Sequence, residues 1–591
     1  MFGTKSNDAR PSIGRSFGFF QLLKQCRFAV FTIIVASALV NILYLTSSLF
    51  MLQVYDRIIP SKSITSLIAL AILALALYIF QGLFELFRGR LLVRIAGVFD
   101  DNLAKRVLRS TMRAHLLKDA STDGFQSMRD FDQIRTFLAS SGPSAVLDLP
   151  WLPLYLAICF MFHPVVGWCA VAGGLILLML TLATSISTKR STKRVFELAN
   201  SRNNLAQTAQ RNAEVIHAMG MATNLTRLWA EQNDDYKRNQ QSNADVLNAF
   251  MVASKLFRVA LQSAVLAVGA VLVIDGLASG GIIIAASILT ARALSPIEQI
   301  IGNWRNMVTA VQSWKRLQAA LAATADDGLR TALPAPSQQL TIEDLACAPP
   351  QQRRPTISGI SFSITAGSAL GVVGRSSCGK STLARAIAGI WPLARGKVRL
   401  DGAATDQWDP EQLGAHIGYL PQDIELFSGT ISQNISRFQA DPDPRGILEA
   451  AKAAGVHEMI LRLPNGYDTE IGRNGSMLSA GQRQRIGLSR ALYGDPFLVI
   501  LDEPNSNLDA EGEAALTEAI LSVRRRQGIV IVIAHRPSAL AAVDQILMMH
   551  EGQVQAFGPK DQIFARIIRQ DSANGQGERS VPLKVVGEKQ E

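Results

Sequence analysis

A phosphate-binding loop constrains the fold of this chain more than any other feature of its sequence. The loop lies between an apolar segment, Ala369–Val373, and a segment of helical pattern, Thr382–Ile390. Its two glycines permit a tight turn that points successive amide N–H groups at phosphate oxygens, and the helix N-terminus favours negative charge. The pattern predicts a strand–loop–helix unit that binds a nucleoside triphosphate. The residues expected to hold that nucleotide are Gly374, Arg375, Ser376, Ser377, Cys378, Gly379, Lys380, Ser381 and Thr382.

Two of these side chains have specific expected roles. Lys380 would reach the β- and γ-phosphates, and the Ser381 hydroxyl would ligate Mg²⁺. The alternative is a Gly/Ser-rich turn that matches the pattern by chance. Motifs further along the chain weigh against that alternative.

The 591 residues divide into two halves of different character. Residues 28–321 contain long apolar stretches, whereas residues 340–570 have the composition of a soluble α/β domain, and residues 322–339 form a linker. Residues 1–27 are expected to be a cytoplasmic segment. The polar residues 571–591 are expected to be a disordered tail.

Charge and cysteine content exclude several classes of protein. A net charge of +11 would suit nucleic acid, but the basic residues flank apolar segments, so membrane lipid is the expected partner and nucleic acid is not. Five scattered cysteines form no CxxC pair, so neither a disulfide framework nor a zinc site is indicated. No cleavable signal pattern precedes the first apolar run, which therefore predicts a retained anchor.

Six apolar segments are long enough, or nearly so, to cross a bilayer, which takes about 20 helical residues. The last two carry arginines near their ends, so a buried helical hairpin is the alternative for that pair. The tight turn Ala278–Gly281 between two apolar arms favours spanning. The six segments are Phe28–Leu52, Ile64–Phe87, Ala145–Phe162, Val165–Ile186, Phe257–Leu277 and Gly280–Leu294.

Lys and Arg are concentrated before the first span and after the second and fourth, and the turns His163-Pro164 and Ala278–Gly281 contain neither. The positive-inside rule therefore places both termini and both long loops in the cytoplasm. The stretches Arg88–Ser144 and Ser187–Lys255 have helical periodicity, so the spans should continue as long cytoplasmic helices. Asp148 near the third span either faces a pathway or caps a helix, and capping with interfacial anchoring is favoured.

Further motifs follow the phosphate loop in a defined order. Gln422 follows a strand and would coordinate Mg²⁺ and position water. The run Leu478-Ser479-Ala480-Gly481-Gln482 resembles the signature loop, whose serine hydroxyl and amides would meet the γ-phosphate of ATP held by the opposite subunit. The strand Phe497–Leu501 leads to Asp502, which would hold Mg²⁺ directly or through water, and to Glu503, which would act as general base on the attacking water.

Two more positions complete the set. Ser506–Asp509 resembles the loop that communicates across the ABC dimer, which implies a nucleotide-site role for Asp509. The strand Ile531–Ala534 delivers His535, whose imidazole would contact the γ-phosphate and orient Glu503. Each motif taken alone could also be an ordinary structural feature, such as a helix start, an apolar strand ending in two acids, or a histidine in a loop. Their shared order within one domain identifies an ABC ATPase, because other P-loop families lack the signature loop.

Two departures from the family pattern carry predictions. Residues 340–360 contain no aromatic side chain to stack on adenine, so GTP is expected to compete with ATP. Cys378 lies near a helix N-terminus, where thiolate character rises, so alkylation should block hydrolysis and ATP should protect. The alternative is that Cys378 is a small packed residue.

Several membrane-half segments resemble a narrower group, the type I secretion ABC transporters, and within it the alkaline-protease and RTX-protein exporters of Gram-negative bacteria. The segment before the signature, Thr469–Gly475, is similar to a loop that senses the membrane helices in such exporters. The membrane-half segments that carry this resemblance are Phe50–Ser61, Asp148–Trp151 with His163-Pro164, Ala213–Val215 with Ala218–Met221, and Arg292–Glu298.

The resemblance implies an all-α six-helix transmembrane domain of ABC exporter type followed by an α/β P-loop ATPase domain, in a homodimer that uses ATP and Mg²⁺ in the bacterial inner membrane. It implies export of an unfolded protein with a C-terminal signal, together with a periplasmic membrane-fusion adaptor and an outer-membrane channel. About 27 residues precede the first span, too few for the peptidase-like domain of bacteriocin and haemolysin exporters. The alternatives are an exporter of lipid or small amphiphiles, and a nucleotide-gated regulator or channel.

Overall fold

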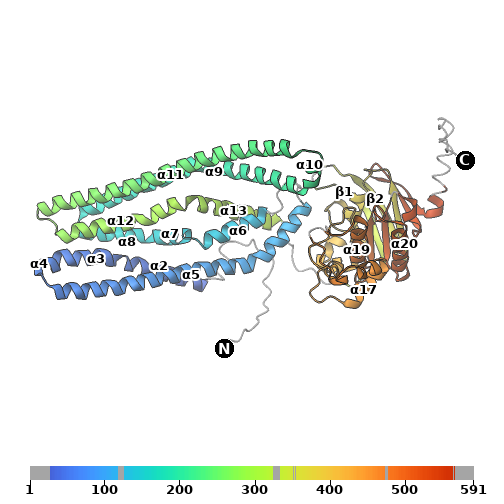
Figure 1. Ribbon diagram of the computed structural model, residues 1–591, viewed down its shortest axis with the longest axis horizontal. Coiled ribbons are helices and arrows are strands. Elements are labelled where there is room, and N and C mark those ends of the chain that lie inside the picture. Colours follow the sequence, from blue (N-terminus) through green and yellow to red (C-terminus); the bar gives the residue numbers. More distant parts are fainter. Residues whose placement is uncertain are drawn as a thin grey trace, which may run out of the picture. The chain divides into compact units, whose positions relative to one another are not determined.

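The computed structural model describes residues 27–117, 126–323, 333–350, 352, 354–472, 475, 477–534, 536–563 and 565. The described residues form two compact units, one ending at residue 323 and the other beginning at residue 333, apart from residues 116–117, which group with the second unit. The first unit is helical, and the second combines helices with two β-sheets (Figure 1).

Long helices build the first unit. α5, with 54 residues, would extend about 80 Å at 1.5 Å per residue, far more than a bilayer requires. α9 and α11 are of similar length and run alongside each other (Figure 1). The expected continuation of the spans as long helices is therefore confirmed. The helices are α2 (Arg27–Leu43), α3 (Leu45–Gln53), a π-helical turn (Val54–Ile58), α4 (Ile59–Ser61), α5 (Ile64–Leu117), α6 (Gln126–Leu138), α7 (Gly142–Asp148), a 3₁₀ turn (Leu149–Trp151), α8 (Leu152–Phe162), α9 (Pro164–Arg211), α10 (Ala213–Ala218), α11 (Ala222–Ile274), α12 (Gly280–Gly302) and α13 (Trp304–Ala323).

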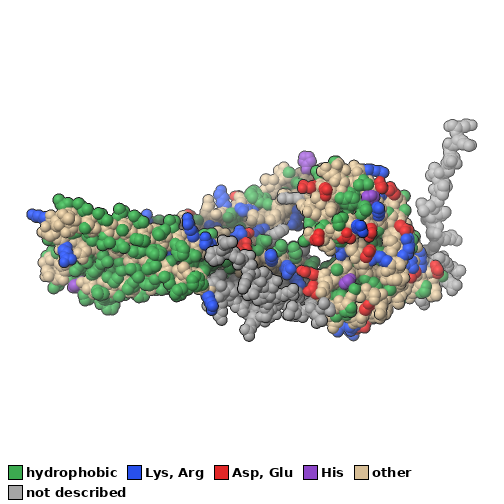
Figure 2. All heavy atoms as spheres, turned by 90° about the horizontal axis from the view of Figure 1, so that it is seen from below, with side chains coloured by type: hydrophobic (Ala, Val, Ile, Leu, Met, Phe, Trp, Pro, Cys, Tyr) green, Lys and Arg blue, Asp and Glu red, His purple; other side chains and the backbone are tan. Residues whose placement is uncertain are grey.

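Six helical segments of this unit are long and apolar enough to cross a membrane. They correspond to the six expected spans, although the fifth helix ends at Ile274, three residues before the expected Leu277. The last pair is joined by a tight turn between Ile274 and Gly280. Figure 2 shows apolar side chains covering most of the visible face of these helices, with Lys and Arg gathered at the ends of that band. Apolar surface on this scale suits a lipid environment.

The expectation that Asp148 caps a helix is wrong. It stands at the start of the 3₁₀ turn, but its side chain makes no capping hydrogen bond. Its Oδ1 instead accepts hydrogen bonds from Ser37 Oγ at 2.6 Å and Asn41 Nδ2 at 2.8 Å, and it pairs with Arg88 Nη1 at 2.7 Å. An intramembrane carboxylate is costly without a counter-charge, so pairing across α2, α5 and α7 prevails over a local cap.

The second unit contains two sheets. A four-stranded antiparallel sheet has the order β2-β1-β4-β5, and a six-stranded sheet has the order β10-β9-β3-β8-β7-β6. In the larger sheet, β9, β3, β8, β7 and β6 are parallel, and β10 is the antiparallel edge. The strands are β1 (Gln339–Cys347), β2 (Ile357–Thr365), β3 (Ala369–Gly374), β4 (Leu393–Leu400), β5 (Ala403–Ala404), β6 (Ile417–Leu420), β7 (Leu498–Asp502), β8 (Ile529–Ile533), β9 (Gln545–His550) and β10 (Gln553–Pro559).

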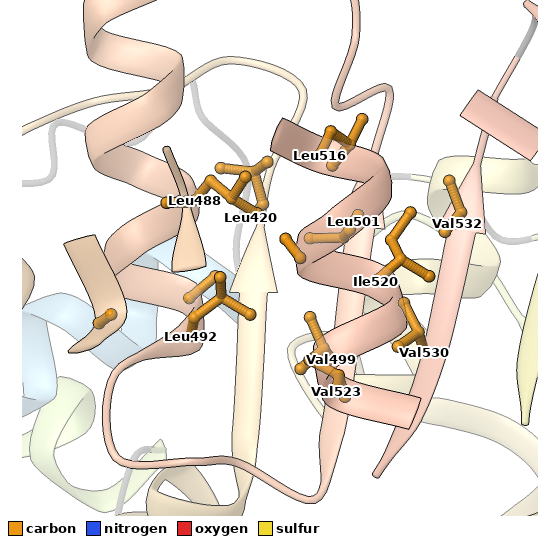
Figure 3. Close-up of a cluster of buried hydrophobic side chains, with 14 of the residues drawn as sticks. Leu420, Leu488, Leu492, Val499, Leu501, Leu516, Ile520, Val523, Val530 and Val532 are labelled. Atoms are coloured by element: carbon orange, nitrogen blue, oxygen red, sulfur yellow. The ribbon is translucent and has the colours of Figure 1, made fainter. Parts of the chain in front are cut away.

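Helices cover the larger sheet. The central strands β7 and β8 are apolar runs buried along their whole length, as expected for parallel strands covered on both faces. Figure 3 shows side chains from β6, β7 and β8 meeting those of α19 and α20. The helices are α14 (Lys380–Ile387), α15 (Pro410–His416), α16 (Ile431–Ile435), α17 (Pro444–Ala453), α18 (His457–Leu461), α19 (Ala480–Leu492) and α20 (Ala510–Arg525), with 3₁₀ turns at Thr405–Gln407, Gly466–Asp468 and Pro537–Leu540.

Element boundaries differ from the sequence expectation by one to three residues. The helix after the phosphate loop begins at Lys380 rather than Thr382 and ends at Ile387, and Gly389 shortly beyond it has a left-handed φ of 69°. Glycine in that conformation stops a helix without steric cost. The strand expected at Ile531–Ala534 spans Ile529–Ile533 instead.

Candidate nucleotide-binding site

The phosphate loop follows β3 directly and leads into α14. Gly379 has a φ of 99°, and a Cβ there would lie 2.5 Å from Ile357 Cγ2, so only glycine fits. Gly374 is equally restricted, since a Cβ would lie 2.5 Å from the carbonyl oxygen of Met549. Ser377 also has a left-handed φ of 64°. This sequence of turns forms the concave backbone expected for phosphate binding.

Lys380 is buried beneath this loop. Its Nζ donates to the carbonyl oxygens of Gly374 at 2.9 Å and Arg375 at 2.8 Å, and lies 3.9 Å from Cys378 Sγ. The ammonium group is therefore held at the loop that would receive the phosphates. Cys378 is 7 % exposed and packs against Gly374, where an added Cβ would lie 2.7 Å from the sulfur.

The acidic end of β7 faces the start of α14. Ser381 Oγ donates to Asp502 Oδ1 at 3.2 Å, while Asp502 Oδ2 is buried without a hydrogen-bond partner among the described residues. Burial raises the pKa of Asp502, and the hydrogen bond from Ser381 partly opposes that shift. An orphaned carboxylate oxygen beside a serine hydroxyl is a donor set that suits Mg²⁺.

The next residue turns away from Asp502. Glu503 has a φ of 51°, in the left-handed region, which costs a non-glycine residue about 1–3 kcal/mol unless its surroundings hold it. Its N–H donates to the carbonyl of Ile533 on β8 at 3.0 Å, and its Oε2 accepts from Gln422 Nε2 at 3.2 Å. The sharp turn separates the two acids and brings Glu503 to the glutamine that follows β6.

These contacts follow from sheet topology. β3, β6 and β7 are parallel members of one sheet, so the loops after their carboxyl ends lie along the same edge. Ligand sites of open α/β sheets lie at that edge. The structure therefore brings Ser381, Asp502, Gln422 and Glu503 together, as the motifs predict. His535, the other residue expected here, lies outside the described residues.

The serine-bearing loop opens α19. Ser479 is the N-cap: its Oγ accepts from Gln482 N at 3.2 Å, and its N–H donates to Gln482 Oε1 at 2.9 Å. This reciprocal capping box fixes the helix start. Ala480 and Gly481 form the first turn, and a Cβ on Gly481 would lie 2.9 Å from the carbonyl oxygen of Asn507.

Asp509 is the N-cap of α20. Its Oδ1 accepts from Gly512 N at 2.8 Å and pairs with Arg485 Nη2 at 2.5 Å. The backbone hydrogen bond from Gly512, followed by the Arg485 guanidinium, lowers the pKa of Asp509. The structure thus gives Asp509 a capping role. Contact with nucleotide remains a prediction.

Sequence reasoning missed two residues beside the site. Gln484 is buried in the second turn of α19 and contacts the loop after Glu503. Tyr419, on β6, is a neighbour of both Arg385 and Asp502, and burial, together with the Asp502 charge, raises its pKa. Gln484 lies just after the signature run. Tyr419 lies within the run that ends at Gln422, but no role was assigned to it.

The geometry and the two-unit organisation define an ATP-binding cassette protein with its own membrane domain. Residues 357–506 match the family model described as "ABC transporter", and residues 30–295 match the model described as "ABC transporter transmembrane region". The chain is 59% identical over 580 residues to the "Type I secretion system ATP-binding protein PrsD" of Rhizobium meliloti (strain 1021), covering 98% of this chain and 99% of that protein. The chain therefore belongs to the ABC transporters of type I secretion systems.

More distant relatives carry names of the same kind. The "Cyclolysin secretion/processing ATP-binding protein CyaB" of Bordetella pertussis is 27% identical over 93% of this chain and 77% of its own length. The "Alpha-hemolysin translocation ATP-binding protein HlyB" of Escherichia coli is 26% identical over 90% and 76%. Among solved structures, a bacterial Atm1-family ABC exporter with ATP bound matches with a TM-score of 0.79 at 22% identity, covering 94% of this chain and 99% of that one. That likeness shows the fold.

Proposed function

We propose that this chain is the ATP-hydrolysing membrane component of a type I secretion system, which exports an unfolded protein carrying a C-terminal signal. The observation that carries the proposal is the meeting of Ser381 with Asp502, and of Gln422 with Glu503, beside the phosphate loop. The same chain supplies six membrane-spanning segments, so nucleotide hydrolysis and transport belong to one polypeptide. Similarity to PrsD over nearly the whole chain supports protein as cargo.

The residues present indicate how ATP is held and hydrolysed. The loop amides from Gly374 to Thr382 and the Lys380 ammonium would bind the phosphates, while Ser381, Asp502 and Gln422 would ligate Mg²⁺. When bound, Mg²⁺ neutralises phosphate charge and orients the γ-phosphate. Glu503 would accept a proton from water held between its carboxylate and the Gln422 amide. His535 would contact the γ-phosphate.

The second half of each site would come from a second copy of the chain. Ser479 is exposed at the start of α19. Its hydroxyl accepts from Gln482 N but can still donate its own proton, and the amides of Ala480 and Gly481 precede the first intrahelical hydrogen bond, so these groups would face an anion. In the proposed homodimer, the Ser479–Gln482 loop of one protomer covers the γ-phosphate held by Lys380 of the other. Hydrolysis then requires that the two ATPase units meet.

The membrane placement follows from charge. Lys and Arg flank the cytoplasmic ends of the spans, so both termini and the ATPase unit lie in the cytoplasm of a bacterial inner membrane. A periplasmic membrane-fusion adaptor and an outer-membrane channel would complete the conduit. Exposed apolar side chains on the spans would contact lipid.

A secretion assay tests this function. Proteins released by a strain lacking the gene are compared with those of the same strain carrying either the wild-type chain or Glu503→Gln. We expect the wild type alone to restore one or more secreted proteins with intact C-termini. Unchanged secretion on gene loss, together with ATPase stimulation by lipids, would favour lipid export instead.

A further inference from the structure

The first turns of α19 contact the loop that carries Glu503. This loop, residues 503–509, meets α19 at three points: Gly481 lies against the Asn507 carbonyl, Gln484 lies between Pro504 and Asn507, and Arg485 pairs with Asp509. The middle contact is the most extensive. Gln484 Nε2 donates to the carbonyl oxygen of Pro504 and lies 3.4 Å from that of Glu503. Its Oε1 accepts from Asn507 N at 3.1 Å.

Burial distinguishes Gln484 from the ion pair beside it. Gln484 is 2 % exposed, whereas the Asp509 side chain is 68 % exposed, so water and salt screen the pair between Arg485 and Asp509. A buried amide that satisfies backbone donors and acceptors is hard to displace, because each broken bond leaves a buried polar group unpaired. Gln484 is therefore the rigid link between α19 and the loop.

Gln484 holds a loop that begins at a residue with a strained backbone. Glu503 has a left-handed φ, and its N–H donates to the carbonyl oxygen of Ile533 on β8. The direction of its carboxylate toward Gln422 depends on that backbone. Gln484 holds the loop immediately after it, so a change in the position of α19 would reach Glu503 chiefly through this buried side chain, the most extensive of the three contacts.

We propose that Gln484 is a positioning residue that couples the two ATP sites of the dimer. The inference rests on the function proposed above, in which Ser479 contacts the nucleotide of one site while Glu503 serves the other. α19 begins at the nucleotide held by the partner and, five residues later, holds the loop of its own chain's base. Closure on one ATP thereby sets the carboxylate at the other, which makes hydrolysis cooperative in ATP.

The test uses the purified full-length chain in lipid nanodiscs, with ATP hydrolysis and fluorescent-ATP binding as readouts. Gln484→Met removes both polar contacts at similar volume, and Gln484→Glu keeps the acceptor for Asn507 while losing the donor to Pro504. Ser489→Ala is the matched control, because Ser489 is fully buried on the same helix and its hydroxyl has no partner among the described residues.

We expect both Gln484 variants to lower kcat about 10- to 100-fold, as for a misplaced catalytic group, with KM and ATP binding near wild type. The Hill coefficient should fall toward 1, and Ser489→Ala should change neither quantity more than about twofold. Gln484→Met added to Glu503→Gln should lower the rate no further, because it acts through the base.

Three results overturn the proposal. They are wild-type turnover in both variants, loss of ATP binding in both, or a further rate loss when Gln484→Met is added to Glu503→Gln. Loss of ATP binding would mean that Gln484 merely maintains the fold. Normal hydrolysis by the Glu503→Gln variant alone would instead show that Glu503 is not the base, whatever the role of Gln484.

Discussion

The buried ion pair between Arg88 and Asp148 should make a large and strongly coupled contribution to stability. The two side chains are 10% and 6% exposed, and Asp148 Oδ1 also accepts hydrogen bonds from Ser37 and Asn41. Asp148→Ala leaves the guanidinium buried without this carboxylate, which should cost about 3–5 kcal/mol of unfolding free energy. Replacing both partners, Arg88→Met with Asp148→Leu, removes the buried charges and should recover most of that loss.

The assay is denaturant unfolding of the full chain in mixed detergent micelles, followed by circular dichroism. The control is the exposed pair of Arg238 and Asp235, with side chains 75% and 62% exposed, where Asp235→Ala should cost less than about 0.5 kcal/mol. The expected order of midpoints places Asp148→Ala lowest, the double variant well above it and Asp235→Ala near wild type. A double variant that unfolds at or below the midpoint of Asp148→Ala would refute the reasoning.

Three further predictions concern the nucleotide site. Because burial raises the pKa of Asp502, its contribution to stability is greatest below its ordinary value of 3.8 and is lost as pH rises through the raised value. Asp502→Asn should therefore unfold at a higher temperature than wild type at pH 7, with the difference closing toward pH 4, while hydrolysis is lost; a lower midpoint at pH 7 would contradict this. N-ethylmaleimide should block hydrolysis by alkylating Cys378, and bound ATP should slow that alkylation. The Cys378→Ala variant should hydrolyse ATP at the same rate with and without N-ethylmaleimide. Full activity of treated wild type would disprove this prediction. GTP should compete measurably in an ATP hydrolysis assay, since residues 340–360 offer no aromatic side chain for adenine, and strict ATP preference would disprove it.

Much of the site could be predicted from sequence because its motifs are local. The phosphate loop is fixed by two glycines that no other residue can replace, and the central strands are continuous apolar runs ending in functional residues. Parallel topology then brings the ends of β3, β6 and β7 to one edge without further information. Ser381, Gln422 and Glu503 were predictable for this reason.

The remaining contacts depend on pairs far apart in the chain. Asp148 stands beside a turn, a position typical of a cap, and its pairing with Arg88 sixty residues earlier becomes visible only when the helices are packed. Gln484 resembles any polar residue of a surface helix until α19 is placed against residues 503–509. Single-sequence patterns report local geometry, whereas these two side chains are fixed by tertiary packing.

The most direct test of the central claim uses mixed dimers, joined as tandem fusions, with Lys380→Ala and Ser479→Arg placed on different chains or on the same chain. If each site combines Lys380 of one chain with Ser479 of its partner, separate placement leaves one intact site and joint placement leaves none. We predict hydrolysis from the first fusion and background from the second. Hydrolysis from the second fusion alone would place both residues in one site of a single chain and contradict the account.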